Sequence, residues 1–407
     1  MSNTKRKPVK EFGKLYEYLK DHALRTEERG TGHIDIKDAD FTGLSIDGGF
    51  YGTWQNFIFT NCLFPTSQVF QLKETTGCIF NSCEFGPGRK DVAMSFGTMK
   101  NCTFTKCTFT NGSVSFGLGE ATFNDCEFEN TTSSNRSWNH YIAGHNLLLN
   151  NCKFRFYDLT GRRKLHMKGC DYMSSGSGSL DSGKEHYVAD FIFEDTRLAN
   201  AEKLLWNNKI NNLTLRGCAV RGVFSAQHGH IRDTITLERL KVGTYHLNRS
   251  GTEKKITVRD CHFSEVNEST TYLFSCSGDY AAEFLMERVE GSAAAAINLT
   301  GASSKTTEQF RMETTRNQTL TLRGCKIPHL MLHWLQTHNL VIEGCEFDRL
   351  ELPNGRIGTL TIRDTRFNTL DLTNTLATKF DIQPSGQVAA AGSNYPQGGY
   401  KIDGSKK

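Results

Sequence analysis

The chain has 407 residues, of which 37% are hydrophobic and 23% are charged, and its net charge at pH 7 is +4. Residues 1–32 carry 8 basic and 5 acidic side chains and residues 384–407 carry 3 basic and 1 acidic, which leaves a net charge of −1 for the body. A near-neutral body excludes a strongly acidic mimic of DNA. It also excludes a non-specific DNA binder, which needs a basic surface.

Residues 1–32 are predicted to form a basic segment and a capping helix, which spans residues 8–25. Apolar residues recur here near the 3.6-residue period of a helix, with lysine and glutamate on the other face. They are Val9, Phe12, Tyr16, Leu19 and Ala23. We expect this helix to cover the first coil of the repeat that follows, because the open ends of stacked repeats are usually capped.

A repeat of the form apolar-x-apolar-x-(Asn/Asp/Gly)-Cys-x-Phe runs through residues 33–385. Phe57–Phe64 is an early copy, Leu147–Phe154 is a middle one and Leu340–Phe347 is a late one. Self-similarity at a period of about 20 to 26 residues is typical of a solenoid. The alternation of apolar and polar residues within each copy predicts a strand.

The small polar residue before the cysteine favours a bend, because Gly, Asn and Asp tolerate left-handed backbone geometry. A strand, a bend, a second short strand and a variable return loop make one coil of a parallel β-helix. A leucine-rich horseshoe shares the period but needs a helical return. The sequence therefore predicts an all-β protein, a single-stranded right-handed parallel β-helix (solenoid) of about 15 coils with an N-terminal α-helical cap.

The position that the cysteine occupies in each copy of the repeat is called the slot here. Two residues before the slot, the charge of the side chain alternates in sign from copy to copy. In a stack of parallel coils each such position lies about 4.8 Å from the same position of the next coil. Opposite charges across such a ladder are favourable, so the alternation predicts the register. It also predicts an insertion, and not a missing coil, between the sixth and seventh members. The nine members are Lys168, Glu194, Arg216, Glu238, Arg259, Glu287, Arg323, Glu343 and Arg363.

Ten of the 13 cysteines occupy the repeat slot, where we expect them to be buried, reduced fillers of the core. Six of these are Cys62, Cys83, Cys102, Cys126, Cys152 and Cys170. The phenylalanines two residues after the slot should form an inward stack. They are Phe64, Phe85, Phe104, Phe128, Phe154, Phe263, Phe347 and Phe367.

The remaining cysteine patterns bear on metals and on location. No CxxC pair and no Cys–His spacing suited to a metal is present, so we expect neither a metal site nor a cofactor. A buried cysteine stack suits the reducing cytoplasm, and the charged N-terminal segment lacks the apolar region of a secretory signal. No apolar run approaches the roughly 20 residues that span a bilayer. The sequence therefore predicts a cytoplasmic protein with no membrane span.

Cys102–Asn111 reads as two consecutive pentapeptides, and Cys78–Phe85 and Ala39–Gly43 follow nearly the same pattern. On these residues the chain resembles pentapeptide-repeat proteins in its first third. Over residues 33–385 it is similar to right-handed parallel β-helix proteins. The resemblance implies a rigid scaffold, for which inhibitor, immunity or host–microbe conflict roles are common.

Four long insertions interrupt the coils, and loops on a rigid scaffold are where binding residues concentrate. The first insertion, residues 129–146, holds aromatic and histidine side chains of the kind that suit a protein or sugar contact. Farther along, a Trp lies in an alternating apolar run and is expected on the outer face. The predicted binding residues are Trp138, His140, Tyr141, His145 and Trp334. The Gly- and Ser-rich residues 386–407 are predicted to form a flexible tail.

No Ser–His–Asp order, nucleotide loop or cluster of carboxylates stands out, so we expect no catalytic residues. The favoured function is non-enzymatic binding of another protein through the rigid face and the insertions. One alternative is a carbohydrate-active β-helix that binds or cleaves a glycan. A weaker alternative is a structural, filament-forming protein. The body is not expected to bind nucleic acid, and the oligomeric state is left open.

Overall fold

A computed structural model describes residues 6–8, 33–42, 50–64, 70–86, 93–110, 113–129, 141–155, 158–173, 188–199, 209–225, 230–246, 254–264, 272–275, 283–292, 296–299 and 319–383. They form an all-β parallel solenoid of about 10 turns, and no helix occurs among them. The chain divides into two compact units, Met1–Ala199 and Asn200–Lys407. Within the described part, no helix is long and apolar enough to cross a membrane.

Three expectations about the extent of the solenoid are not established by these residues. The expected number of about 15 coils is not supported. The predicted capping helix lies outside the described residues, except that Pro8 forms part of a strand. The predicted tail over residues 386–407 also lies outside them.

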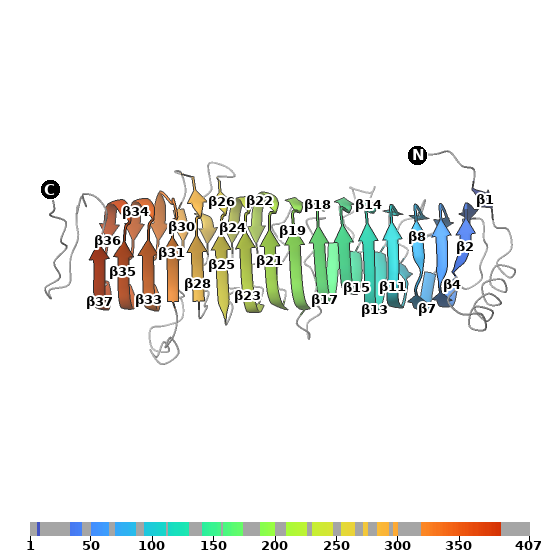
Figure 1. The fold of residues 1–407 in the computed structure, drawn as a ribbon, viewed down its shortest axis with the longest axis horizontal. Helices are drawn as coiled ribbons and strands as arrows, with labels where there is room; N and C mark the ends of the chain where they lie inside the picture. The colour runs from blue at the N-terminus through green and yellow to red at the C-terminus, as the bar shows by residue number, and fades with distance from the viewer. Residues whose placement is uncertain are drawn as a thin grey trace. The chain divides into compact units, whose positions relative to one another are not determined.

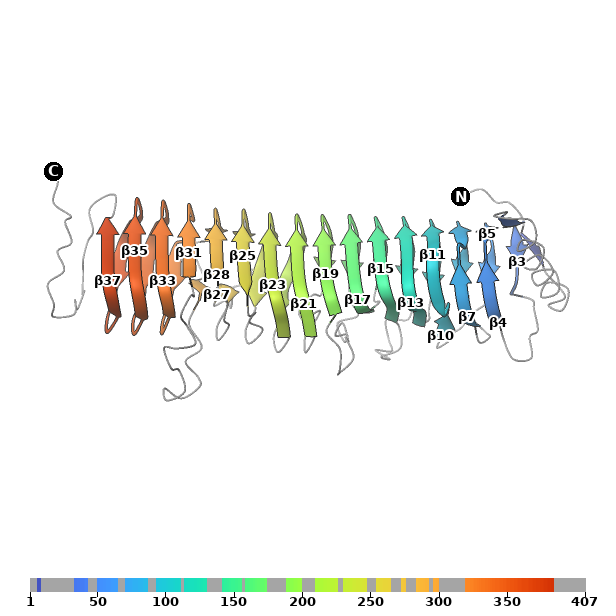
Figure 2. The same cartoon turned by 60° about the horizontal axis from the view of Figure 1, so that its bottom comes forward.

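The strands that precede the bend form a parallel sheet in each unit, called sheet B here (Figures 1 and 2). Buried and outward residues alternate in the part of these strands nearest the bend, as in β5. In the first unit they are β2 (Ile34–Lys37), β4 (Phe50–Gln55), β5 (Phe57–Thr60), β7 (Phe70–Thr76), β8 (Ile79–Asn81), β10 (Ala93–Ser95), β11 (Thr98–Thr105), β13 (Ser113–Asn124), β15 (Tyr141–Asn150), β17 (Asp158–Lys168) and β19 (Val188–Glu194). In the second unit they are β21 (Lys209–Arg216), β23 (His230–Glu238), β25 (Lys255–Arg259), β28 (Glu283–Glu287), β31 (Thr319–Arg323), β33 (Gln336–Glu343), β35 (Arg356–Arg363) and β37 (Leu376–Gln383).

The strands that follow the bend, together with β1 at the start of the chain, form the second parallel sheet, sheet A. In the first unit they are β1 (Lys7–Pro8), β3 (Ala39–Asp40), β6 (Leu63–Phe64), β9 (Glu84–Phe85), β12 (Thr108–Thr110), β14 (Glu127–Glu129), β16 (Lys153–Arg155), β18 (Asp171–Met173) and β20 (Arg197–Ala199). In the second unit they are β22 (Ala219–Ser225), β24 (Lys241–His246), β26 (His262–Phe263), β27 (Tyr272–Ser275), β29 (Glu290–Gly291), β30 (Ala296–Asn298), β32 (His329–Met331), β34 (Glu346–Glu351) and β36 (Arg366–Asp371).

The bend between the sheets is left-handed at the residue before the slot, as the repeat predicts. Asn61 has a φ of 54°, Asp260 of 52° and Gly344 of 61°. Most bends use Asn, Asp, Ser or Gly, for which this geometry costs least. Lys106, Arg239 and Arg288 also adopt it, although their side chains give no such advantage.

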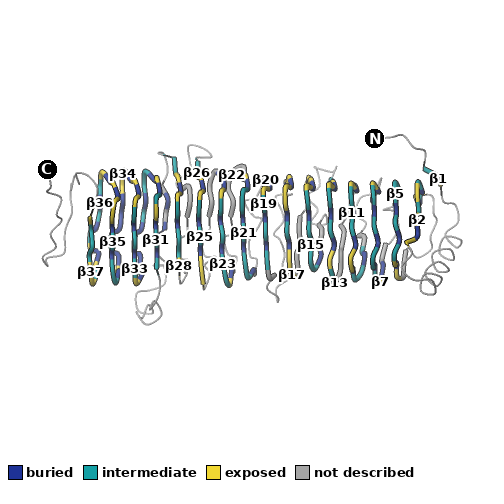
Figure 3. Tube along the Cα trace, in the orientation of Figure 1, coloured by how far each residue is buried: buried dark blue, intermediate teal, exposed yellow. Residues whose placement is uncertain are grey.

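The core lies between the two sheets, with buried and outward residues alternating along most of the strands (Figure 3). The eight phenylalanines predicted to point inward are all buried, at 5% exposure or less. The twelve described cysteines are buried and free. In the first unit, each bend cysteine from Cys62 to Cys170 donates its thiol to a backbone carbonyl, as Cys126 does to Phe104 at 3.5 Å.

One slot was assigned to the wrong cysteine. The amide of Thr108 donates to the carbonyl of Cys83, and that of Glu127 donates to the carbonyl of Cys107, so Cys107 and not Cys102 occupies the bend. The pairs Thr103–Ile79 and Thr105–Asn81 place Cys102 in sheet B instead. The two consecutive pentapeptides offer two cysteines in similar settings, and the local pattern is the same around both.

The registers confirm the charge ladder within each unit. In the first unit Lys168 lies opposite Glu194. In the second unit the opposed pairs are Arg216–Glu238, Glu238–Arg259, Arg259–Glu287, Glu287–Arg323, Arg323–Glu343 and Glu343–Arg363. Because Glu287 pairs directly with Arg323, no coil is missing between them. Residues 300–318 of this insertion lie outside the described part.

Candidate functional site

Three consecutive coils of the second unit have the same length and carry no insertion, and all of their residues are described. Strand β32 pairs with β34 and β34 with β36, so that Leu330 lies opposite Leu350 and Leu350 opposite Leu370. Regular coils of this kind present a rigid outer surface on sheet A. The part of this surface called the Trp334 face here consists of His329, His333, Trp334, Arg349, Glu351 and Asp371.

Trp334 lies at the tip of the tight turn that follows β32. Its side chain is exposed, at 48%, while the neighbouring Leu332 and Leu335 are buried. The amide of Trp334 donates to the carbonyl of Pro353 at 3.0 Å, and that of Leu335 donates to Leu332 at 3.2 Å. The indole is therefore held out from the surface by an ordered turn.

The backbone of Trp334 is left-handed, with a φ of 57°. The same position in the next two coils is Asn354, at 60°, and Asn374, at 55°. Asparagine tolerates this region well, whereas a bulky residue there costs on the order of 1 kcal/mol or more. The stability of the turn alone would therefore favour Asn over Trp at this position.

Glu351 provides a buried negative charge beside this turn. Its side chain is only 6% exposed, and its Oε2 lies 2.6 Å from Nε2 of His333. Its Oε1 lies 3.3 Å from Nε2 of His329 and also contacts Nε of Arg349. A buried carboxylate needs such partners, because an unpaired one is costly. The contacts hold His333, next to Trp334, in a fixed orientation.

Asp371 lies opposite Glu351 on the adjacent strand. Burial works to raise the pKa of Asp371, but hydrogen bonds from Thr373 and the charges of His333 and Arg349 hold this pKa below its ordinary value. The Thr373 amide donates at 2.9 Å and its hydroxyl at 2.6 Å. Two carboxylates thus lie opposite each other on neighbouring strands, and one of them, Glu351, contacts the histidine that precedes Trp334.

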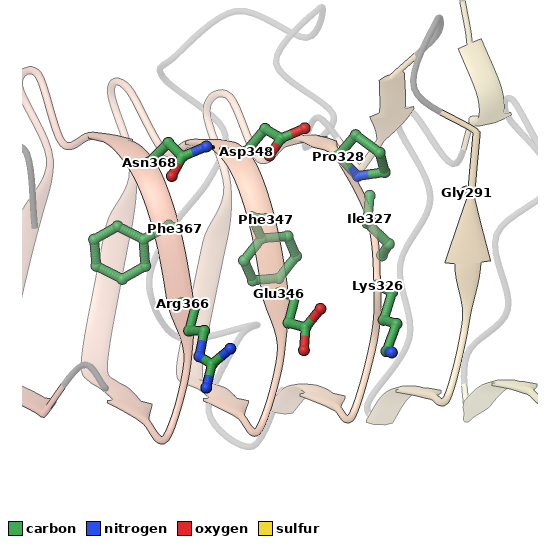
Figure 4. A pocket seen from close by; sticks show the side chains of 10 residues that line it. All are labelled: Gly291, Lys326, Ile327, Pro328, Glu346, Phe347, Asp348, Arg366, Phe367 and Asn368. Atoms are coloured by element: carbon green, nitrogen blue, oxygen red, sulfur yellow. Dashed lines mark hydrogen bonds between the residues drawn. The ribbon is translucent and has the colours of Figure 1, made fainter. Parts of the chain in front are cut away.

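The same three coils carry a groove of about 740 Å³ at the beginning of their sheet A strands (Figure 4). Beside the groove, the amides of Asp348 and Arg349 both donate to the carbonyl of Pro328. One row of its lining bears alternating charges. The opposite row holds Pro328, Asp348 and Asn368, and Asn368 donates to Asp348 at 3.2 Å. It is lined by Gly291, Lys326, Ile327, Pro328, Glu346, Phe347, Asp348, Arg366, Phe367 and Asn368.

The charged row of the groove belongs to a second alternating ladder, one residue after the slot, which sequence reasoning missed. In the first unit it pairs Lys153 with Glu127 at 2.9 Å and Arg197 with Asp171 at 3.0 Å. In the groove the consecutive members lie opposite one another, but no ion pair joins any two of these described side chains; they are Lys326, Glu346 and Arg366. The sequence signal was present, at the same spacing as the first ladder.

The structure describes three of the five predicted binding residues. Trp138 and His140 lie outside the described residues. Tyr141 begins β15, where its backbone pairs with Asp158, and His145 lies half-buried in the same strand and has contacts of its own. Trp334 lies in the other unit and is exposed. The sequence analysis did not predict the other residues of the Trp334 face. Aligning each coil on the next would have brought three of them, His329, Arg349 and Glu351, into the same region.

Among the described residues, no group of three or more His, Cys, Asp or Glu side chains is arranged to hold a metal ion. Comparisons with protein-family models, with curated proteins and with solved structures gave no match for this chain. The Trp334 face and the groove are therefore interpreted from their own geometry.

Proposed function

We propose that this protein is a non-enzymatic binding protein whose partner is another protein, and that the Trp334 face is a contact surface. The observation that carries the proposal is the exposed tryptophan in a left-handed turn position where the next two coils have Asn354 and Asn374. Backbone strain that the fold does not require is typical of functional positions.

The chemistry around Trp334 also supports a protein contact. Trp and Arg are enriched among the residues that contribute most to the binding energy of protein interfaces. Arg349 is 59% exposed and is held by Glu351, so it is oriented beforehand. A partner that covers Trp334 would also cover this arginine and His333.

The proposal is tested by Trp334→Asn, which introduces the residue of the two following coils. We expect the variant to be as stable as the wild-type protein or slightly more stable, because the turn strain is relieved. We also expect it to lose a specifically captured partner in pull-downs from the native cell. Leu376→Asn is the matched control, since Leu376 is exposed, at 59%, but lies outside the Trp334 face. Equal capture of the same partner by both variants would contradict the proposal.

A second candidate function is the binding or cleavage of a glycan. It is favoured by the opposed carboxylates Glu351 and Asp371 and by the exposed Trp334, on which a sugar ring could stack. Glycosidases use two carboxyl groups about 5 to 9.5 Å apart. Incubation of the protein with neutral and acidic polysaccharides tests this reading. Turnover that Glu351→Gln abolishes without a loss of glycan binding would favour it over protein binding.

Several finer expectations remain part of the proposal. We infer that the solenoid is right-handed, has about 15 coils and has pentapeptide-like coils in its first third. We also propose a cytoplasmic location, supported by the buried thiols, which donate hydrogen bonds that only reduced cysteines can make. An inhibitor, immunity or host–microbe conflict role would be one form of the proposed binding to another protein. Deletion of residues 130–140, which leaves β14 and β15 intact, tests whether that insertion is a second contact surface.

A further inference from the structure

The charged row of the groove consists of exposed side chains without ionic partners. Lys326, Glu346 and Arg366 are exposed, and no ion pair joins any of them to another residue of the described part. In two of the same coils, Arg323 and Glu343 of the first ladder do pair, 3.2 Å apart. The coil spacing therefore allows ion pairs, and the groove leaves its charges available to a ligand.

The arrangement of the charges suits a ligand that carries both signs. The middle coil presents two carboxylates, Glu346 and Asp348, in the two rows of the groove, whereas the coil before it presents Lys326 and the coil after it presents Arg366 (Figure 4). A polyanion would bring negative charge against the two carboxylates, which is unfavourable. The ligand that fits best therefore carries an anion, a cation and an anion in a line.

The spacing of the row distinguishes a helical ligand from an extended one. Successive coils are about 4.8 Å apart, so the third charge lies about 9.6 Å from the first. An extended peptide presents side chains of one face about 6.8 Å apart, and its third charge would overshoot the row by about 4 Å. A helix rises about 1.5 Å per residue, so that residues i+3 and i+7 lie about 4.5 and 10.5 Å beyond residue i, on the same face. The helix thus matches all three positions to about 1 Å.

We propose that the groove binds one helix of the partner protein, which lies along the charged row. This helix has an acidic residue at i, a basic residue at i+3 and an acidic residue at i+7. The two acidic residues pair with Lys326 and Arg366. The basic residue pairs with Glu346 and Asp348 of the middle coil.

The groove adjoins the Trp334 face on sheet A of the same three coils. Pro328 lines the groove, and the next residue, His329, belongs to the face. Asp348 and Arg349 are related in the same way. A partner that contacts Trp334 can therefore place a helix in the groove. This inference rests on the proposed function, because it names the element of the partner that binds beside Trp334.

Synthetic helices test the inference directly, without the native partner. The probe is a labelled, alanine-rich peptide of about 20 residues, long enough to be helical, with Glu at i, Lys at i+3 and Glu at i+7. One control peptide has the opposite signs, and the other has the residues of the probe in scrambled order. In fluorescence anisotropy with the full chain at low salt, the probe should bind roughly tenfold more tightly than either control. The preference should disappear in molar salt.

Inversion of the groove charges should invert the preference. The variant Lys326→Glu, Glu346→Lys, Asp348→Lys and Arg366→Glu should bind the peptide of opposite signs more tightly than the probe. The matched control is Glu127→Lys with Lys153→Glu, which exchanges an ion pair of the same ladder in the first unit and should keep the wild-type preference. Thermal melting shows whether each variant is folded. If the inverted variant is not, Gln at the same four groove positions should abolish the difference between the two peptides.

Equal binding of the probe and both controls by the wild-type protein overturns the inference. So does an unchanged preference in the inverted or Gln variant, or tighter binding of unstructured polyglutamate than of the probe. The proposed function fails separately. Loss of partner capture in Trp334→Asn without discrimination among the peptides contradicts the helix alone, whereas discrimination with full capture by Trp334→Asn supports the helix and contradicts the Trp334 face.

Discussion

The two units fill the same kind of core with different side chains. In sheet A of the first unit the rings of Phe64, Phe85, Phe109, Phe128 and Phe154 stack in one column, with successive centroids 4.7 Å apart. At the same position of sheet A in the second unit the column is mixed, with aliphatic Val220, Val242 and Ile327 beside Phe263, Phe347 and Phe367. The inward Leu320, Leu340 and Leu360 of sheet B in that unit are aliphatic. The coil spacing of about 4.8 Å matches the separation of stacked rings, so one Phe per coil packs without a gap. Aliphatic chains meet the same requirement through volume alone.

The outer surfaces of the two units also differ at one position of the repeat. Two residues before the slot, sheet B of the first unit is uncharged over five coils: Thr60, Asn81, Thr105, Asn124 and Asn150. Asn150 donates to Asn124 there at 2.9 Å. In the second unit the same row is the charge ladder, with Arg216 2.6 Å from Glu238 and Arg259 2.7 Å from Glu287. The same backbone arrangement thus carries either neutral or ionic side-chain pairs. Only the stability contributed by the ionic rows should depend on the salt concentration.

The largest expected effect is the loss of a stacked ring. Phe85 is fully buried and stacks on Phe64 and Phe109, so Phe85→Ala should lower the free energy of unfolding by about 3 to 5 kcal/mol. Leu360→Ala in the second unit should cost about 2 to 5 kcal/mol, without the stacking contribution. Hydrogen exchange resolved by strand, together with denaturant melts, measures both. If Phe85→Leu is as damaging as Phe85→Ala, the ring stack is essential; if it is mild, volume alone suffices.

High pH should destabilise a coil that has a buried thiol in its slot. Burial raises the pKa of the Cys261 thiol to about 12. A group whose pKa is raised on folding contributes its full stability below the unfolded pKa, about 8.5, and loses it as the pH rises toward the folded value. We expect a loss of roughly 1.4 kcal/mol for each pH unit in this window. Cys261→Val should reduce the slope, since the adjacent slots, Leu240 and Val289, do not titrate; an unchanged slope would contradict the assignment.

The introduction of an arginine should cost more stability in the ionic row than in the neutral one. Glu238→Arg places three like charges in succession with Arg216 and Arg259, and should cost about 1 to 2 kcal/mol at low salt. Asn124→Arg in the neutral row should cost clearly less. The difference should shrink in molar salt, where exposed charges are screened. Equal costs for the two variants at low salt would show that the ladder does not set the register.

The smallest expected effect concerns a bend. Arg239 has a φ of 52°, and the same position in other coils is Gly217, Gly324 or Gly344. Arg239→Gly should stabilise the protein by about 0.5 to 1 kcal/mol, because glycine adopts this geometry without strain. Thr236→Gly, at an extended position of β23, is the control and should destabilise. Denaturant midpoints compare the two, and a loss of stability in both would show that the side chain of Arg239 contributes more than its backbone strain costs.

Much of the scaffold could be predicted because each coil repeats the residue pattern of the coil before it. The inward Phe and Cys positions, the left-handed bend at residues such as Asn61 and the opposition of Glu287 and Arg323 all follow from period and sign. The prediction was wrong at Cys102, because Cys107 offers the same local pattern shortly afterwards and only pairing with the neighbouring coils distinguishes the two.

The candidate site was predicted only in part. Trp334 was expected on the outer face because the alternating apolar residues around it point inward. The ionic contacts of the neighbouring His333 were not expected, because Glu351 and Arg349 belong to the following coil and are distant along the chain. Nothing in the local pattern distinguishes a buried carboxylate from the exposed acidic residues of other coils.

The sequence by itself determined the class of fold and the order of its coils, because a strict period leaves one way to bury the apolar side of each strand. Tertiary structure alone decided which outward residues meet. Residues one coil apart become neighbours at the spacing of paired strands, and this brings His333 onto Glu351 and leaves Lys326, Glu346 and Arg366 along a groove. Those contacts depend on side-chain orientation, which the repeat does not specify.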